Sequence, residues 1–157
     1  MKYLLSLALA TIGSVAYLSS DASPMRSMNT VVKKEIIRTT EAPNQSPLYS
    51  QGVKVGATIY VTGTLGVDPE TNAQAGTTIQ EQTKQALINC RAILRAAGAD
   101  LENVVEVQVL LARPDDFAGL NEAYAPFFPK DPPTRTVARL GPELPNVLVS
   151  IRMTAVL

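Results

Sequence analysis

The sequence predicts one α+β domain, built as a mixed sheet with two helices on one of its faces. Two observations support this fold class. Patterns typical of strands and helices follow one another in the order strands, helix, strand, helix, strands. Two helices are also too few to cover both faces of four to six strands, so we expect the other face, which is apolar, to meet another subunit. At 157 residues, 46% of them apolar and 18% charged, the chain has the length and composition of one globular domain.

The N-terminal half of the domain is expected to begin with short strands that turns connect. Residues 35–38 hold one short apolar patch, and residues 53–65 hold two strand signals separated by a Gly-Ala pair. The second of these signals, residues 58–62, is β-branched and aromatic, as strands prefer. Residues 68–72, with the sequence DPETN, predict a turn.

The strongest helix signal follows this turn. Thr78 and Glu81 have the spacing of a capping box, in which a hydroxyl is followed three residues later by a carboxylate. Apolar residues then recur at intervals of three and four and form one helix face: Ile79, Ala86, Leu87, Cys90, Ile93, Leu94 and Ala97. Gly98 is placed to end the helix in the left-handed conformation.

The rest of the chain predicts a strand, a second helix and two closing strands. Residues 104–111 alternate with period two, which places these four side chains on one face: Val105, Val107, Val109 and Leu111. The second helix is expected from about Asp115, where acidic residues suit a helix N-terminus, to the prolines that begin at Pro129. Residues 135–140 and 147–157 predict the closing strands.

The first 27 residues are expected to be a targeting segment rather than part of the fold. They comprise a short basic start, an apolar stretch at residues 3–18 and an exit of small residues, which is typical of a secretory signal peptide. A membrane anchor is the second interpretation, because the apolar stretch is short for a membrane span and is interrupted by polar residues. A mitochondrial presequence is the third, because such presequences are rich in Arg and this segment is not. The secretory pathway or an organelle is the expected location, with the cytoplasm or the mitochondrion as the alternative, and Met28 is a possible alternative start. Residues 28–45 are interpreted as a lead-in strand and loop.

The composition excludes several kinds of chemistry. Lys and Arg total 14, as do Asp and Glu, so the chain has no net charge that would favour nucleic acid or an anionic membrane. With no His and one Cys, a His-containing catalytic triad and an intrachain disulfide are excluded, and a dedicated zinc or iron–sulfur site is not expected. Cys90 lies on the apolar helix face, which favours a buried structural thiol over a reactive one.

From residue 46 to residue 157 the chain carries a series of short motifs in fixed order. They are Tyr49-Ser50-Gln51-Gly52, Val61-Thr62-Gly63, QTKQALIN at residues 82–89, Ala96-Ala97-Gly98, Val104-Val105-Glu106-Val107, Asp116-Phe117, Asn121-Glu122-Ala123-Tyr124, Pro132-Pro133-Thr134-Arg135 and Leu144-Pro145. As a set, these motifs resemble the RidA (YjgF-type) family. The N-terminal extension lies outside the resemblance.

The resemblance implies a fold, an assembly and an activity. The fold is a chorismate-mutase-like single α+β domain, which assembles as a homotrimer with a ligand cleft at each subunit boundary. The implied activity is hydrolysis of reactive 2-imino acids, the imine forms of enamine intermediates, to 2-keto acids and ammonia. No cofactor and no metal are implied. The expected partners are a small 2-imino or 2-keto carboxylate and further copies of the chain, with no nucleic acid and no membrane association after processing.

The resemblance also implies site residues. Arg135 matches the family arginine that holds the substrate carboxylate, and its planar guanidinium suits a carboxylate bidentately. Tyr49 matches a tyrosine of the cleft, and Asn121 matches an asparagine of the cleft; each is equally well explained as an ordinary core or helix-face residue. The backbone of three further residues matches positions that line the cleft: Thr62, Gly63 and Val137.

One position departs from the family pattern. Deaminating members carry a glutamate in the final strand that is thought to handle the attacking water, and here that position is Ser150. A serine hydroxyl can hold a water but is a poor general base at neutral pH. Two hypotheses therefore remain: an imine deaminase, and a non-catalytic protein that binds or senses a small carboxylate.

Overall fold

The computed structural model describes residues 32–43 and 47–157. The predicted targeting segment, residues 1–27, and part of the predicted lead-in lie outside the described residues. Within the described ranges, no helix is long and apolar enough to cross a membrane.

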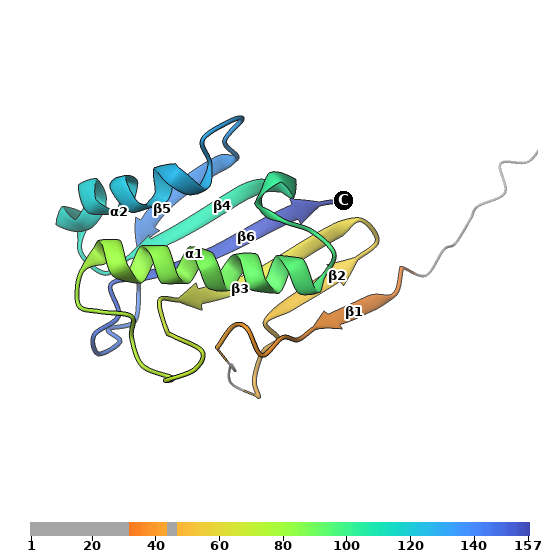
Figure 1. The fold of residues 1–157 in the computed structure, drawn as a ribbon, viewed down its shortest axis with the longest axis horizontal. Helices are drawn as coiled ribbons and strands as arrows, with labels where there is room; N and C mark the ends of the chain where they lie inside the picture. Colours follow the sequence, from red (N-terminus) through yellow and green to blue (C-terminus); the bar gives the residue numbers. More distant parts are fainter. Residues whose placement is uncertain (1–31, 44–46) are drawn as a thin grey trace, which may run out of the picture. The chain divides into compact units, whose positions relative to one another are not determined.

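The described residues form one mixed sheet of six strands in the order β1-β2-β3-β6-β4-β5 (Figure 1). All neighbouring strands run antiparallel except β4 and β5, which run parallel. Because β5 is the last strand in this order, it is an edge strand. The strands are β1 Lys34–Ile37, β2 Gly52–Val55, β3 Thr58–Leu65, β4 Val104–Leu111, β5 Thr134–Arg139 and β6 Val149–Val156. The predicted strands are therefore confirmed, with ends shifted by up to three residues.

Two helices lie on the same face of the sheet, as predicted (Figure 1). The long helix α1, Ile79–Ala96, packs on β3 and β6, and the short helix α2, Phe117–Tyr124, packs beside α1. Three 3-10 turns complete the elements: η1 Leu101–Asn103, η2 Pro114–Asp116 and η3 Ala125–Phe127. The opposite face of the sheet carries no helix in the described part of the chain.

Helix α1 begins and ends as its sequence predicts. The Thr78 side chain accepts a hydrogen bond from the Glu81 backbone N–H, and the Glu81 carboxylate accepts one from the Thr78 backbone, which completes the capping box. Gly98 has a φ of +84°, the left-handed conformation that ends the helix. All the predicted apolar face residues of α1 are buried.

Helix α2 differs from the prediction at both ends. The acidic residues at 115–116 lie in η2 rather than in α2, and the Asp116 carboxylate pairs with Arg113 at 2.9 Å instead of capping the helix. The helix ends at Tyr124, well before Pro129. Pro126 explains the early end, because a proline cannot donate the next backbone hydrogen bond of an α-helix.

The alternation in β4 begins one residue away from the predicted position. A register shift between Val104 and Glu106, where β4 pairs with β6, turns Val104 into the core and leaves Val105 48% exposed. From Val107 onward the predicted alternation holds, and Val107 and Val109 are fully buried. In β6, four alternate residues are buried in the core: Val149, Ile151, Met153 and Ala155.

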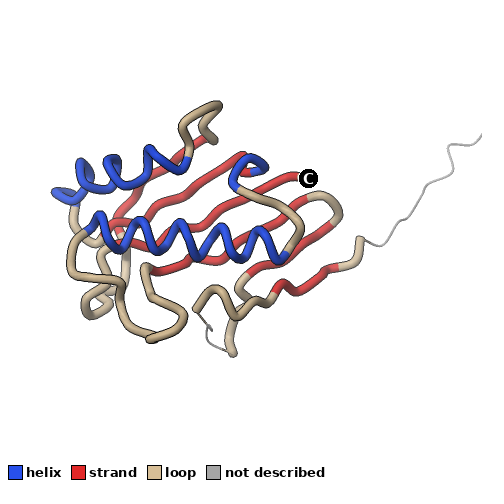
Figure 2. Tube along the Cα trace, viewed as in Figure 1, coloured by secondary structure: helices blue, strands red, loops and turns tan. Residues whose placement is uncertain are grey.

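Loops, drawn in tan, connect the helices and strands in Figure 2. The buried side chain of Gln82 ties two of the loops to the start of α1. The Gln82 side-chain amide donates to the carbonyl oxygens of Gly76, at 3.2 Å, and Asn146, at 2.8 Å. Its oxygen accepts the Leu148 N–H at 2.9 Å. Because Leu148 immediately precedes β6, this side chain fixes where β6 begins and hence where Ser150 lies.

Candidate active site

Arg135 lies on the edge strand β5 and is exposed. In the parallel pairing of β4 and β5 it stands opposite Val107, a core residue on the helix-covered face. Side chains opposite each other in neighbouring strands share a face, so Arg135 points to the side of the sheet that carries α2. Its guanidinium carbon lies 4.7 Å from the ring centroid of Tyr124 and 6.0 Å from that of Phe117, both on α2.

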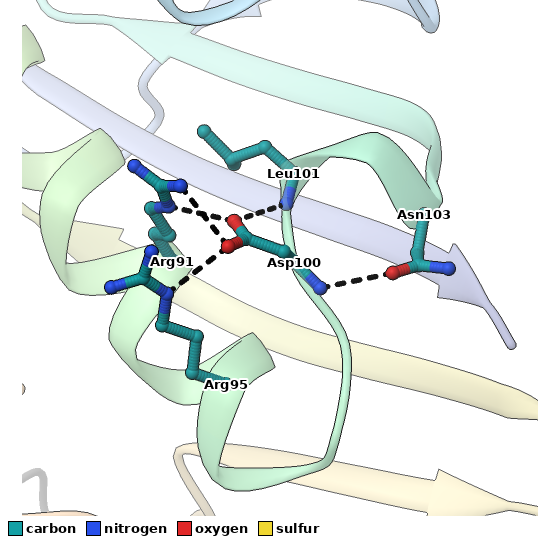
Figure 3. Close-up of polar contacts among 5 residues, drawn as sticks. All are labelled: Arg91, Arg95, Asp100, Leu101 and Asn103. Atoms are coloured by element: carbon teal, nitrogen blue, oxygen red, sulfur yellow. Dashed lines mark hydrogen bonds and ion pairs between the residues drawn. The ribbon is translucent and has the colours of Figure 1, made fainter.

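Arg135 has no acidic partner within the described ranges, a property that it shares with Arg38, Arg139 and Arg152. Arg91 and Arg95 both pair with Asp100, at 2.6 and 3.1 Å (Figure 3), and Arg113 pairs with Asp116. The charge of Arg135 is instead set against two aromatic rings. A guanidinium in this position remains able to bind an incoming carboxylate.

The aromatic residue closest to Arg135 is itself fixed by packing. Tyr124 is 7% exposed, and its ring lies 4.8 Å from that of Phe128. Burial raises the pKa of the Tyr124 phenol to about 12, although the nearby Arg135 charge lowers it in part. Tyr124 is therefore neutral at physiological pH and does not form an ion pair with Arg135.

Two more predicted site residues lie beside Arg135. Asn121 follows Phe117 by four residues and precedes Tyr124 by three, so all three occupy one side of α2. Val137 stands two residues after Arg135 on the same face of β5, and it lines a hollow of about 450 Å³ together with Phe117. The remaining lining residues are Leu111, Pro114, Ala138 and Arg139. We call Arg135, Val137, Asn121, Phe117 and Tyr124 the arginine cluster.

A second group of predicted site residues gathers where β3 meets β6. The pairing of these strands is shifted between Val61 and Thr64, so Thr62 and Gly63 form a bulge. A Cβ atom added at Gly63 would lie 3.0 Å from the Ser150 hydroxyl oxygen, so the Gly63 backbone and the Ser150 side chain are close neighbours. We call Thr62, Gly63 and Ser150 the glycine cluster.

Tyr49 lies before β2 and is 52% exposed. It lines a hollow of about 970 Å³ whose other residues include Arg38 and Pro69. The Thr62 N–H donates to the Gln51 carbonyl at 3.0 Å, so the segment that carries Tyr49 borders the glycine cluster. The Gln51 side-chain amide holds this segment in turn, since it bonds to the carbonyl oxygens of Thr39, Ala42 and Pro43.

The two clusters face opposite sides of the sheet. Ser150 stands opposite Leu110 in β4, whereas Arg135 and Val137 stand opposite Val107 and Val109. Successive residues of a strand point to opposite faces, so Ser150 lies on the helix-free face and Arg135 on the helix-covered face. A single chain therefore brings together Arg135, Val137 and Asn121, and separately Thr62, Gly63 and Ser150, but does not join the two clusters in one cleft.

The contribution of Phe117 and Tyr124 to the site was not predicted from the sequence. Both residues stand there only as members of the Asp116-Phe117 and Asn121-Glu122-Ala123-Tyr124 motifs. Their spacing of seven residues, with Asn121 between them, places them on the same side of α2 as a predicted cleft residue. This spacing is the one feature of the sequence that indicates their role. It does not show that Arg135 on β5 contacts the rings of Phe117 and Tyr124.

The described residues contain no cluster suited to a metal. No group of three or more His, Cys, Asp or Glu side chains is placed to hold an ion within residues 32–43 and 47–157. Cys90 is fully buried, as predicted for a structural thiol, and its Sγ lies 3.6 Å from the Ile151 carbonyl oxygen. Burial raises the pKa of this thiol to about 12, so it is not a nucleophile in the folded state.

The fold and the clusters define a mixed α+β domain with an unpaired arginine set on aromatic rings at its sheet edge. Residues 39–157 match the sequence profile of the family described as Endoribonuclease L-PSP. The chain belongs to this family, which is also known as RidA/YjgF.

Several relatives of known name are similar to the chain. It is 40% identical over 114 residues to the mouse (Mus musculus) 2-iminobutanoate/2-iminopropanoate deaminase, covering 73% of this chain and 84% of the relative. It is 35% identical over 147 residues to the chloroplastic Reactive Intermediate Deaminase A of Arabidopsis thaliana, covering 92% and 79%. A RutC family protein of Saccharolobus solfataricus is 43% identical over 122 residues, covering 78% and 97%.

Solved structures show the same fold. RidA from an Antarctic Psychrobacter species superposes with a TM-score of 0.73 at 35% identity, covering 78% of this chain and 99% of the other. The TdcF protein of E. coli, solved with bound serine, superposes with a TM-score of 0.74 at 31% identity, covering 78% and 98%. These matches confirm the predicted RidA-like fold class.

Proposed function

We propose that this protein hydrolyses 2-imino acids to 2-keto acids and ammonia in a cleft that two subunits of a homotrimer form together. The observation that carries the proposal is Arg135, an exposed guanidinium that lies on two aromatic rings and has no acidic partner in the described part of the chain. Such a group suits the carboxylate of an imino acid. The names of the mouse and Arabidopsis relatives support the same reaction.

The reaction asks little of the protein. Water attacks the imine carbon and forms a C–O bond, a proton moves to nitrogen, and the C–N bond then breaks to release ammonia and leave a keto group. A protonated imine is already electrophilic, so the protein mainly orients the substrate and holds the water. Arg135 would fix the carboxylate, while the Ser150 hydroxyl and the Gly63 backbone would line the place where water attacks.

The position of the two clusters favours a site shared between subunits. Arg135 and Ser150 lie on opposite faces of one sheet, so they meet the same ligand only if they come from different copies. In a cyclic trimer, one surface of each subunit contacts a different surface of the next, and this arrangement repeats the same cleft three times. The helix-free sheet face is then covered by the assembly.

Ser150 favours a second candidate, a carboxylate-binding protein without catalysis. A general acid or base typically contributes about 10²–10⁴-fold to a rate, and the Ser150 hydroxyl is a poor substitute for one. Glu143 does not lie in the glycine cluster of the single chain: it lines a hollow with Arg139 and Leu140, and Arg139 also borders the hollow of the arginine cluster. The E. coli TdcF structure with bound serine is consistent with a pocket of this family that holds a small carboxylate.

RNA cleavage, which the family description names, is a weaker fit. The chain has 14 basic and 14 acidic residues and no His, so it offers neither a net positive charge for phosphates nor an imidazole for acid–base chemistry. We therefore propose a small carboxylate, and not nucleic acid, as the ligand.

The test generates 2-iminopropanoate or 2-iminobutanoate in situ and follows its decay with purified protein. Arg135→Ala is expected to lower kcat/KM by about 10- to 100-fold, the effect of losing a charge-assisted hydrogen-bonded pair. The kcat/KM of Arg135→Lys should lie between those of the wild type and Arg135→Ala. Arg95→Ala, which removes an exposed arginine on α1 outside both clusters, is the matched control and should match the wild type.

The two candidates give different results in a paired measurement. Titration of 2-ketobutyrate by calorimetry measures binding without catalysis. If the wild type binds 2-ketobutyrate in an Arg135-dependent manner but does not speed imine decay, the binding protein is the correct candidate. If the heat of 2-ketobutyrate binding is the same for Arg135→Ala as for the wild type, both the deaminase and the binding protein that use Arg135 are excluded.

A further inference from the structure

Arg135 is placed by aromatic rings rather than by an acid. A long arginine side chain at an exposed strand edge ordinarily samples many rotamers. Here its guanidinium carbon lies 4.7 Å from the centroid of the Tyr124 ring, well inside the range of a cation–π contact, and 6.0 Å from the centroid of Phe117, at the limit of that range. Tyr124 is thus the principal contact and Phe117 the secondary one.

The Tyr124 ring has a fixed position of its own. It comes from the buried side of α2 and packs against Phe128 at 4.8 Å. Its hydroxyl is buried and has no hydrogen-bond partner among the described residues. The ring rather than the hydroxyl is therefore the part of Tyr124 that contributes to the site.

An aromatic support differs from an acidic one in its effect on ligand binding. A carboxylate beside Arg135 would hold the guanidinium but would compete with the carboxylate of the ligand. The face of a ring attracts the cation through its quadrupole and leaves the N–H groups at the edge of the guanidinium free. Neutral Tyr124 and Phe117 therefore restrict Arg135 without occupying its hydrogen-bonding edge.

We infer that Tyr124 and Phe117 are positioning residues, which hold the Arg135 guanidinium ready for a ligand carboxylate. The inference depends on the proposed role of Arg135 as the carboxylate anchor. It assigns no direct contact between either ring and the substrate.

The first test measures the arrangement of Arg135 without any ligand. In an NMR spectrum of the arginine Nε–H groups, with the Arg135 signal identified by its loss in Arg135→Lys, ring currents should shift this proton away from its random-coil position. Tyr124→Phe keeps the ring and should keep the shift, whereas Tyr124→Leu should abolish most of it. An unmoved signal in Tyr124→Leu would overturn the inference whatever the activity.

The second test measures the consequence for binding. Tyr124→Leu should weaken 2-ketobutyrate binding and raise KM by about tenfold, within the range of a cation–π contact, with kcat within about twofold of the wild type. Tyr124→Phe should bind like the wild type. Tyr124 is buried, so its substitution can disturb the fold, whereas Phe117 is 47% exposed and easier to replace. The Phe117 ring is also farther from Arg135, so Phe117→Leu should weaken 2-ketobutyrate binding by only about twofold.

A double variant separates positioning from direct contact. In an Arg135→Ala background, Tyr124→Leu should cause no further loss of binding, because there is no guanidinium left to place. An equal loss in both backgrounds would show that Tyr124 acts on the ligand or the fold instead. If the NMR shift behaves as expected while the wild type fails to hydrolyse imines, the proposed deaminase activity fails and the positioning role stands.

Discussion

At the scale of single residues, the close contact between the Gly63 backbone and the Ser150 side chain is the main feature of the glycine cluster. A Cβ at Gly63 would stand 3.0 Å from the Ser150 Oγ, closer than most Cβ contacts, while the Gly63 backbone is not in the left-handed region. The close approach of Ser150, and not the backbone angles of Gly63, is therefore what favours a glycine here. Its missing side chain leaves room for the Ser150 hydroxyl beside the β3 bulge.

This contact predicts a rescue between two substitutions. Gly63→Ala should force the Ser150 hydroxyl out of its preferred rotamer and lower the free energy of unfolding by about 1 kcal/mol. Ser150→Ala removes the oxygen that Gly63→Ala would crowd. In a Ser150→Ala background, Gly63→Ala should therefore lower the free energy of unfolding by less than it does in the wild type. Urea denaturation of the four proteins measures this coupling, and strictly additive losses would contradict it.

The residue identities of the candidate site could be predicted, but their grouping could not. Arg135 and Ser150 are identified by motif position alone, since the residue types and spacing are visible in the chain. That Arg135 rests on Tyr124 depends on β5 pairing parallel to β4 at the sheet edge, a long-range contact that no local pattern specifies. Cys90 could be predicted as buried because its whole helix face is apolar.

Among the elements, Asp100 joins α1 to the strand that follows it. Its carboxylate accepts hydrogen bonds from the Arg91 and Arg95 side chains and from the Leu101 N–H at 2.7 Å (Figure 3). It also caps η1, which leads directly into β4. These contacts, with the Arg91 hydrogen bond as the largest cause, lower the pKa of Asp100 from 3.8 to about 2.

Asp100→Asn should destabilise the domain in a pH-dependent way. Because the folded-state pKa is below the unfolded value, the charged Asp100 stabilises the fold above that value, and this contribution disappears as the pH falls from about 4 to about 2. We expect a deficit of about 1 kcal/mol at pH 7, discounted because Asp100 is partly exposed.

Urea denaturation at a series of pH values measures this difference, which should shrink to near zero at about pH 2. Asp131→Asn is the matched control, since Asp131 and its partner Lys130 are both 88% exposed, and it should have no effect. A deficit for Asp100→Asn that stays constant down to pH 2 would mean that the charge is not its source.

The elements that sequence patterns predict best are those whose ends carry a local signal. Helix α1 has a capping box at Thr78 and a left-handed Gly98, and both ends were predicted. β4 was placed correctly, but its first residue was assigned to the wrong face because the bulge at Val105 arises from pairing with β6. Such a bulge depends on a partner strand about 45 residues away and leaves no trace in the alternation itself.

For the whole molecule, the opposite placement of the two clusters has a functional consequence. If Arg135 of one subunit works with Gly63 and Ser150 of the next, a variant damaged in one cluster can complement a variant damaged in the other. Arg135→Ala removes the carboxylate anchor, and Gly63→Val places a branched side chain against Ser150. Each variant alone should retain at most about a tenth of the wild-type imine hydrolysis, for different reasons.

Mixed trimers of the two variants should regain activity. Each cleft needs an intact Arg135 from one subunit and an intact Gly63 from its neighbour. Random equal mixing therefore gives an intact cleft at about a quarter of all boundaries, and at about a third of the boundaries within the mixed trimers. Co-expression with two affinity tags isolates the mixed trimers, and imine decay measures their activity against the wild type. Two separately purified variants that are mixed without exchange should stay at the low activity of the single variants. Recovery in the exchanged sample requires a shared cleft, because if both clusters served one site within a single subunit, every site would still contain one damaged cluster.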